Sequence, residues 1–228
     1  MNTTPAWGRF VELRLAQQQQ IISQHPIGWL PWASLTSRGA HLPRGATGLI
    51  AEAVVTGAAR RVGGIIFPLL WYDRDINNPI FHQFLAAQLK SIAAQGFQMA
   101  VVIGIADTAP VDLGLIEIAE TAIAQHRLLT LAVSPLELVD ETMQDRGALW
   151  ETSILLAIRP DLVDLSQLSS DNGHNARDLA SPSLGQQALT LASEQLAKAV
   201  QEVYRHQNAT AVAALYQQRR ARYHKTTL

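Results

Sequence analysis

Residues 27–60 read IGWLPWASLTSRGAHLPRGATGLIAEAVVTGAAR and contain a complete strand–loop–helix unit. The run Ile27–Ala33 is almost entirely apolar, which predicts a short buried strand. Gly48–Arg60 has apolar residues at helical spacing and leads into the pair Arg60 and Arg61, which suits the C-terminus of a helix. Ligands of α/β proteins gather just after the carboxyl ends of strands, so the segment after Ala33 is the first place to look for a site.

The alternation continues along the chain. Further strands are predicted at Gly63–Leu70, Met99–Ala106 and Leu128–Val133, with helices between them at Ile80–Gln95 and Leu113–Gln125. Strands that alternate with helices form βαβ units, which pair in parallel and need helices on both faces of the sheet. The sequence therefore predicts an α/β fold of three layers, with a mostly parallel sheet in the middle.

The C-terminal part is predicted to be mainly helical. Helices are expected at Gly147–Ile158, Gln186–His206 and Thr210–Tyr223, and the polar, glycine-containing segment Ser166–Ser181 is expected to be a loop. We expect one domain over residues 1–228, with residues 207–228 forming a helical C-terminal extension.

The composition narrows the classes of function. The net charge of -1 offers no general attraction to nucleic acid or to anionic membranes, so we expect neither as a partner. There are no cysteines, which excludes disulfides and thiolate chemistry, and the N-terminal segment has no apolar core of a secretory signal, so a cytoplasmic protein is expected. Only 16% of the residues are charged, against roughly 25% in a typical soluble domain, which favours a homo-oligomer over a monomer with an unusually large core.

Several sequence segments together resemble the creatininase family. Leu30–Pro43 (LPWASLTSRGAHLP) is similar to the family signature LPxGSxEQHGPHLP, and Gly45–Ala53 (GATGLIAEA) is similar to GTDTLIAEA. Glu151–Val163 (ETSILLAIRPDLV) resembles ETSxxLAxxPxLV. The resemblance spans roughly residues 27–203 and implies a creatininase-like fold, assembly into hexamers, and amide hydrolysis at a site with two zinc or manganese ions.

The residues that the resemblance aligns with the metal ligands are not ligands in this chain. Thr36 stands at the glutamate and Arg38 at the histidine of EQH, Thr47 stands at the aspartate of GTDT, and Ile105 stands at the histidine of the later NGHGGN segment. A threonine hydroxyl is a poor ligand for a divalent cation, isoleucine is none, and protonated arginine has no lone pair to donate. We therefore expect no metal cofactor, the alternative being zinc or manganese bound by the acidic residues that remain.

Two acidic residues survive at this expected site. Asp107 falls where some members of the family carry a carboxylate ligand, and Glu151 is the glutamate of ETS. Together with Arg38 they form either a remade polar pocket or a buried ion pair that fills the space of the metals, and the second is favoured because desolvated charges are usually paired for structural reasons. His41, from the HLP of the signature, is expected to be a structural histidine.

Three functions are compatible with these residues. The first is a protein without metal-dependent hydrolase activity, acting as a structural or regulatory subunit, with or without an active paralogue, or as a binder of a small ligand. The second is an amidohydrolase that opens a cyclic or linear, creatinine-like amide with a remodelled site containing Asp107 and Glu151. The third is different chemistry in the same pocket. The first is favoured because no nucleophile–base pair and no metal cluster can be assembled from the residues that remain.

Overall fold

The computed structural model describes residues 5–73, 78–105, 109–168 and 174–225. Its centre is one sheet with the strand order β1-β3-β2-β5-β6, in which β4 also pairs with β2. All of these pairings are parallel. The strands are β1 (Trp7–Arg9), β2 (Ile27–Ser34), β3 (Gly64–Ile66), β4 (Leu70–Tyr72), β5 (Met99–Ile103) and β6 (Leu129–Val133).

Strand β2 lies at the centre of the sheet, and all of its residues are buried. Trp29 of β2 is in register with Val101 of β5, and Val101 in turn with Leu131 of β6. Because both faces of this strand are covered, the near-continuous apolar sequence of Ile27–Ala33 is what a central parallel strand requires. The last residue of β2, Ser34, is buried at the carboxyl edge of the sheet.

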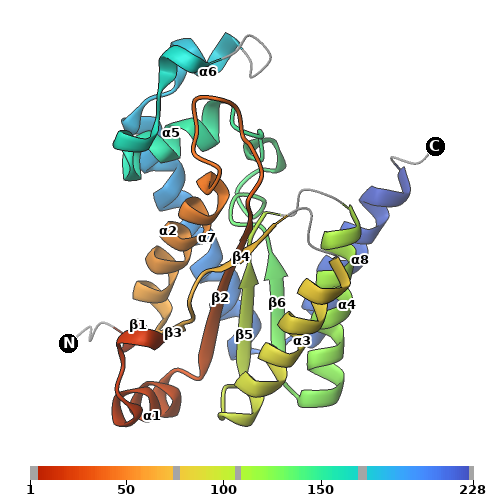
Figure 1. Cartoon of the computed structure of the whole chain (residues 1–228). Coiled ribbons are helices and arrows are strands. Elements are labelled where there is room, and N and C mark those ends of the chain that lie inside the picture. The colour runs from red at the N-terminus through yellow and green to blue at the C-terminus, as the bar shows by residue number, and fades with distance from the viewer. Residues whose placement is uncertain (1–4, 74–77, 106–108, 169–173, 226–228) are drawn as a thin grey trace.

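Helices cover both faces, so the predicted three-layer α/β fold is confirmed (Figure 1). Figure 1 shows α2 (Ala46–Val62), α5 (Leu149–Ile158) and α7 (Pro182–Arg205) on one side of the sheet. On the other side lie α3 (Asn78–Ala94) and α4 (Ala109–His126), and α8 (Ala209–Lys225) runs along the β6 edge of the sheet. The shorter elements are α1 (Leu15–Gln24), α6 (His174–Leu179), and the 3-10 turns η1 (Phe10–Glu12), η2 (Glu141–Met143), η3 (Pro160–Leu162) and η4 (Leu165–Gln167).

Two predicted elements were wrong in detail. Gly63–Leu70 is not one strand but divides into β3 and β4, separated by residues 67–69. Pro68 in this gap has no N–H to give to a ladder of hydrogen bonds, which explains the break. Ser166–Ser181 is not entirely a loop, because it contains the helix α6.

Helix α8 is fixed to β6, the last strand of the sheet. The Tyr216 hydroxyl donates to the carbonyl oxygen of Thr130 at 2.9 Å and accepts from the backbone N–H of Ala132 at 2.8 Å. Arg219 donates to the carbonyl oxygen of Ala132 and pairs with the buried Asp112 of α4. Side chains of α8 thus use backbone groups of β6 that a further strand would otherwise pair with.

Within the described part of the chain, none of the helices combines the length and the apolar character that crossing a membrane demands.

Candidate functional site

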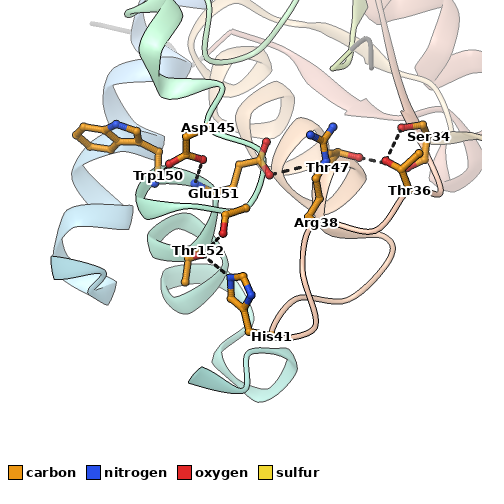
Figure 2. Close-up of polar contacts among 10 residues, drawn as sticks. Ser34, Thr36, Arg38, His41, Thr47, Asp145, Trp150, Glu151 and Thr152 are labelled. Carbon is orange, nitrogen blue, oxygen red and sulfur yellow. Dashed lines mark hydrogen bonds and ion pairs between the residues drawn. The ribbon is translucent and has the colours of Figure 1, made fainter. Parts of the chain in front are cut away.

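The loop that follows β2 carries three of the residues predicted for the site. Thr36 lies beside the end of the strand, with its hydroxyl oxygen 3.2 Å from that of Ser34. Thr47, in the first turn of α2, donates its hydroxyl to the carbonyl oxygen of Ser34 at 3.3 Å. The two threonines are therefore tied to the same strand end, on neighbouring segments of chain (Figure 2).

Arg38 and Glu151 form a buried ion pair at the centre of this arrangement. The Nε atom of Arg38 lies 3.9 Å from Oε2 of Glu151, and the two side chains are only 4% and 1% exposed. Glu151 belongs to the first turn of α5, where the partial positive charge of the helix N-terminus also stabilises a carboxylate. Figure 2 shows Arg38 reaching from its loop toward Glu151 on the facing helix.

A second carboxylate, Asp145, holds the beginning of α5. Its side chain accepts from the backbone N–H of Trp150 at 2.5 Å and from that of Glu151 at 3.3 Å. The N-cap residue, Ala148, has no side chain able to accept these bonds, so Asp145 replaces it. Burial raises the pKa of Asp145, while the hydrogen bonds from Trp150 and Glu151 act in the opposite direction.

His41 connects the same loop to the next residue of α5. Its Nε2 atom lies 2.9 Å from the hydroxyl oxygen of Thr152, which itself donates to the carbonyl oxygen of Gly147 at 3.1 Å. The single hydroxyl proton is used toward Gly147, so His41 is the donor in this contact, from Nε2. Burial lowers the pKa of His41, with the backbone of Gly147 acting against that shift, which agrees with a structural histidine.

Gly147 sits where α5 approaches the loop after β2. Its φ of 84° is in the left-handed region, and a Cβ atom at this position would collide with the backbone of Arg38. Only glycine therefore allows Arg38 to come this close to the start of the helix that carries Glu151.

The structure thus brings Arg38 and Glu151 together and places Thr36 and Thr47 around Ser34. Ile105, which was predicted at a former ligand position, is buried just after β5. Asp107 lies outside the described residues. Sequence reasoning missed Asp145, although an acidic residue just before a predicted helix is a recognised sign of an N-terminal cap.

The chain is similar to known proteins in its structure and not detectably in its sequence. No family model and no curated protein sequence matches the chain. Among solved structures, a tryptophan-to-phenylalanine mutant of creatininase matches with a TM-score of 0.73 at 18% identity, covering 85% of this chain and 98% of that one. A crystal structure of creatinine amidohydrolase (creatininase) matches with a TM-score of 0.71 at 17% identity, covering 88% and 98%. A putative creatinine amidohydrolase from Bacteroides fragilis gives 0.70 at 17%, covering 88% and 96%.

These matches show that the chain has the fold of creatininase over nearly the whole length of those proteins. Solved forms of creatininase include a zinc–zinc form and a manganese form. Among the described residues, the side chains that follow β2 do not suit such ions. Arg38 places a guanidinium beside Glu151, and within residues 5–73, 78–105, 109–168 and 174–225 no three His, Asp or Glu side chains are grouped to hold a metal.

Proposed function

We propose that this chain is a creatininase-family protein in which an internal ion pair has replaced the dinuclear metal site, and that it is not a metal-dependent hydrolase. The observation that carries the proposal is the buried contact between Arg38 and Glu151. Glu151 belongs to the ETS segment, which closely resembles that of the family, and its partner is an arginine where a histidine ligand is expected.

The chemistry of arginine supports this proposal. A guanidinium stays protonated at any working pH and presents only donors, so it neutralises a carboxylate but coordinates nothing. It also repels a cation at the same place, since two positive charges a few ångströms apart in a buried site are strongly unfavourable. Restoring a metal ion at this point would first require that Arg38 leave Glu151.

A protein with this arrangement suits the role of a structural or regulatory subunit, alone or beside an active paralogue. The role of a small-ligand binder at the same site is weaker, because Arg38 and Glu151 are each almost fully buried and already contact each other. In keeping with the sequence, we propose a homo-oligomer, with a hexamer as the form implied by the resemblance, and a cytoplasmic location.

Exposed apolar side chains support the proposed assembly. Trp71 of β4 is 42% exposed, and Ile80 and Phe84 of α3 are 60% and 52% exposed. Residues 80 and 84 are one helical turn apart, so their side chains share a face of α3. Large exposed apolar groups that share a face are typical of contacts between subunits.

The deciding experiment measures metal content and amide hydrolysis on one protein sample. The chain is purified without chelator, its zinc and manganese are determined by elemental analysis, and hydrolysis of creatinine and of simple linear amides is followed with and without added Zn²⁺ or Mn²⁺. We expect less than stoichiometric metal and no metal-dependent turnover. One or more tightly held ions per chain, together with turnover that a chelator removes, would instead establish the amidohydrolase alternative.

A further inference from the structure

A polar groove lies between α2 and α7, and Arg38 and Glu151 are not among its lining residues. It has a volume of about 460 Å³, which is within the range of small-molecule sites. One wall comes from α2, the other from the first half of α7, and one end from β1. Polar side chains line both walls: Glu52, Thr56 and Arg61 on α2, and Gln186, Thr190 and Ser193 on α7.

Positive charge dominates this groove. Its ionisable lining residues are Arg9, Arg60, Arg61 and Glu52, so the arginines outnumber the carboxylate. Arg9 is already used, because it pairs with Glu52 and also donates to the Thr56 hydroxyl at 3.2 Å. The excess of positive charge in the groove therefore belongs to Arg60 and Arg61, in a chain whose overall charge is close to zero.

Arg60 is held in place without a carboxylate. Its guanidinium carbon lies 5.4 Å from the centre of the Trp7 ring, and in the described part of the chain no acidic group lies within ion-pair distance of it. Stacking on an aromatic ring restrains a guanidinium while its N–H groups stay available around its edge.

Arg61 lies on the same turn of α2 as Arg60, and its present partners leave it able to bind an anion. Its Nη1 donates to the carbonyl oxygen of Gly57 at 2.9 Å, and its Nη2 lies 3.1 Å from a carboxylate oxygen of Glu194. The side chains of this pair are 40% and 53% exposed, so water and salt screen their attraction, and a ligand anion can compete with Glu194.

We propose that this groove is a binding site for a small polyanion, with Arg60 and Arg61 binding its phosphate or carboxylate groups. The planar fork of a guanidinium matches both groups in a bidentate manner. Thr56, Thr190 and Gln186 add hydroxyl and amide groups to the walls, where the rest of such a molecule would lie. The groove does not include Arg38 or Glu151, so this proposal stands or falls independently of the proposed function.

The test is calorimetric titration of the full chain, at low ionic strength, with pyrophosphate and separately with citrate. We expect saturable binding of at least one probe, and the tighter probe identifies the natural ligand as a phosphate or as a polycarboxylate. Arg60→Gln should weaken this binding about tenfold or more, the loss that follows from removing one charge-assisted hydrogen-bonding group. Arg60→Lys, which keeps the charge but not the fork, should give an intermediate loss.

Arg205→Gln is the matched control, because Arg205 is also exposed in the last turn of a helix and lies outside the groove. We expect it to leave the affinity within about twofold, since the same charge is removed far from the ligand. Absence of saturable binding of both probes in the millimolar range, or an equal loss in Arg60→Gln and Arg205→Gln, would overturn the proposal. Unfolding temperatures of the variants show that each one is folded.

Discussion

Arg38 Nε lies 3.9 Å from Glu151 Oε2, and this contact joins the loop after the central strand to the first turn of α5. Neither charge is appreciably exposed to water, so each contributes to the stabilisation of the other. Removal of one partner from such a pair is strongly destabilising, whereas replacement of both is often nearly neutral.

The first prediction concerns this pair. Arg38→Met keeps much of the side-chain volume but removes the guanidinium beside the buried Glu151, and we expect the free energy of unfolding to fall by about 3–5 kcal/mol. Urea denaturation measures the change. The double variant Arg38→Met, Glu151→Gln should recover most of the loss, and Arg159→Met, at an exposed pair with Asp161, should have little effect. A single variant as stable as the wild type would contradict a structural role for the pair.

The second prediction concerns metal affinity. The combined variant Thr36→Glu, Arg38→His, Thr47→Asp replaces a poor ligand set by two carboxylates and an imidazole, the groups that bind zinc and manganese. We expect it to bind Zn²⁺ measurably in calorimetric titration, and the wild type to show no comparable site. Chelator treatment should leave the unfolding temperature of the wild type unchanged. Equal affinity of the two proteins would show that the assignment of former ligand positions is wrong.

The third prediction concerns pH. Burial lowers the pKa of His41 and of His82 below the ordinary 6.5, so below that pH the unfolded chain binds more protons than the folded one. The stabilisation by these neutral rings is complete above about pH 6.5 and is lost as the pH falls, at up to about 1.4 kcal/mol per pH unit for each ring. Urea denaturation between pH 7 and pH 5 measures the slope. His41→Gln should reduce it, and a wild-type profile that is flat in this range would contradict the prediction.

The fourth prediction concerns the attachment of α8. Burial raises the pKa of Tyr216, so its hydroxyl is neutral at any working pH and both donates to Thr130 and accepts from Ala132. Tyr216→Phe leaves both backbone groups without this partner, which should cost about 1–3 kcal/mol. In the Tyr216→Phe variant, hydrogen exchange followed by NMR should be faster at the Ala132 amide than at the amides of β5. Unchanged protection of Ala132 would mean that Tyr216 is dispensable there.

The fifth prediction concerns assembly. If the exposed side chains of Ile80 and Phe84 contact another copy, Phe84→Lys introduces a buried charge into that contact and should lower the particle mass in light scattering. Val11→Lys is a suitable control, because Val11 is also strongly exposed but belongs to η1. A monomeric wild type at micromolar concentration would exclude the proposed homo-oligomer.

The sequence was sufficient for the elements with long, regular patterns. Strands β2, β5 and β6 and helices α2, α3 and α4 lie close to their predicted positions, because apolar periodicity reports burial directly. Strand β1 was not predicted, since it has only three residues and exists through its pairing with β3, more than fifty positions later. Short elements of this kind depend on long-range contacts that no local pattern records.

The site was predicted unevenly for a similar reason. The closeness of Arg38 and Glu151 was predicted from the resemblance to the creatininase family, which aligned both residues with one pocket. The role of Asp145 did not, because it became evident only once the start of α5 was fixed at Leu149 and its free amides were located. Likewise, the requirement for glycine at position 147 follows from its φ of 84° and its closeness to the Arg38 backbone, neither of which is visible in the sequence.

The attachment of α8 to β6 limits how copies of this chain can join. With Tyr216 and Arg219 already bonded to Thr130 and Ala132, an incoming strand at β6 would first have to displace a packed helix and expose Asp112. Assembly by continuing the sheet across this edge, whether into a dimer with a shared sheet or into a fibre, is therefore blocked in the folded protein. Copies of the chain that associate would therefore meet through helical faces or at the opposite end of the sheet, and not through the backbone of β6.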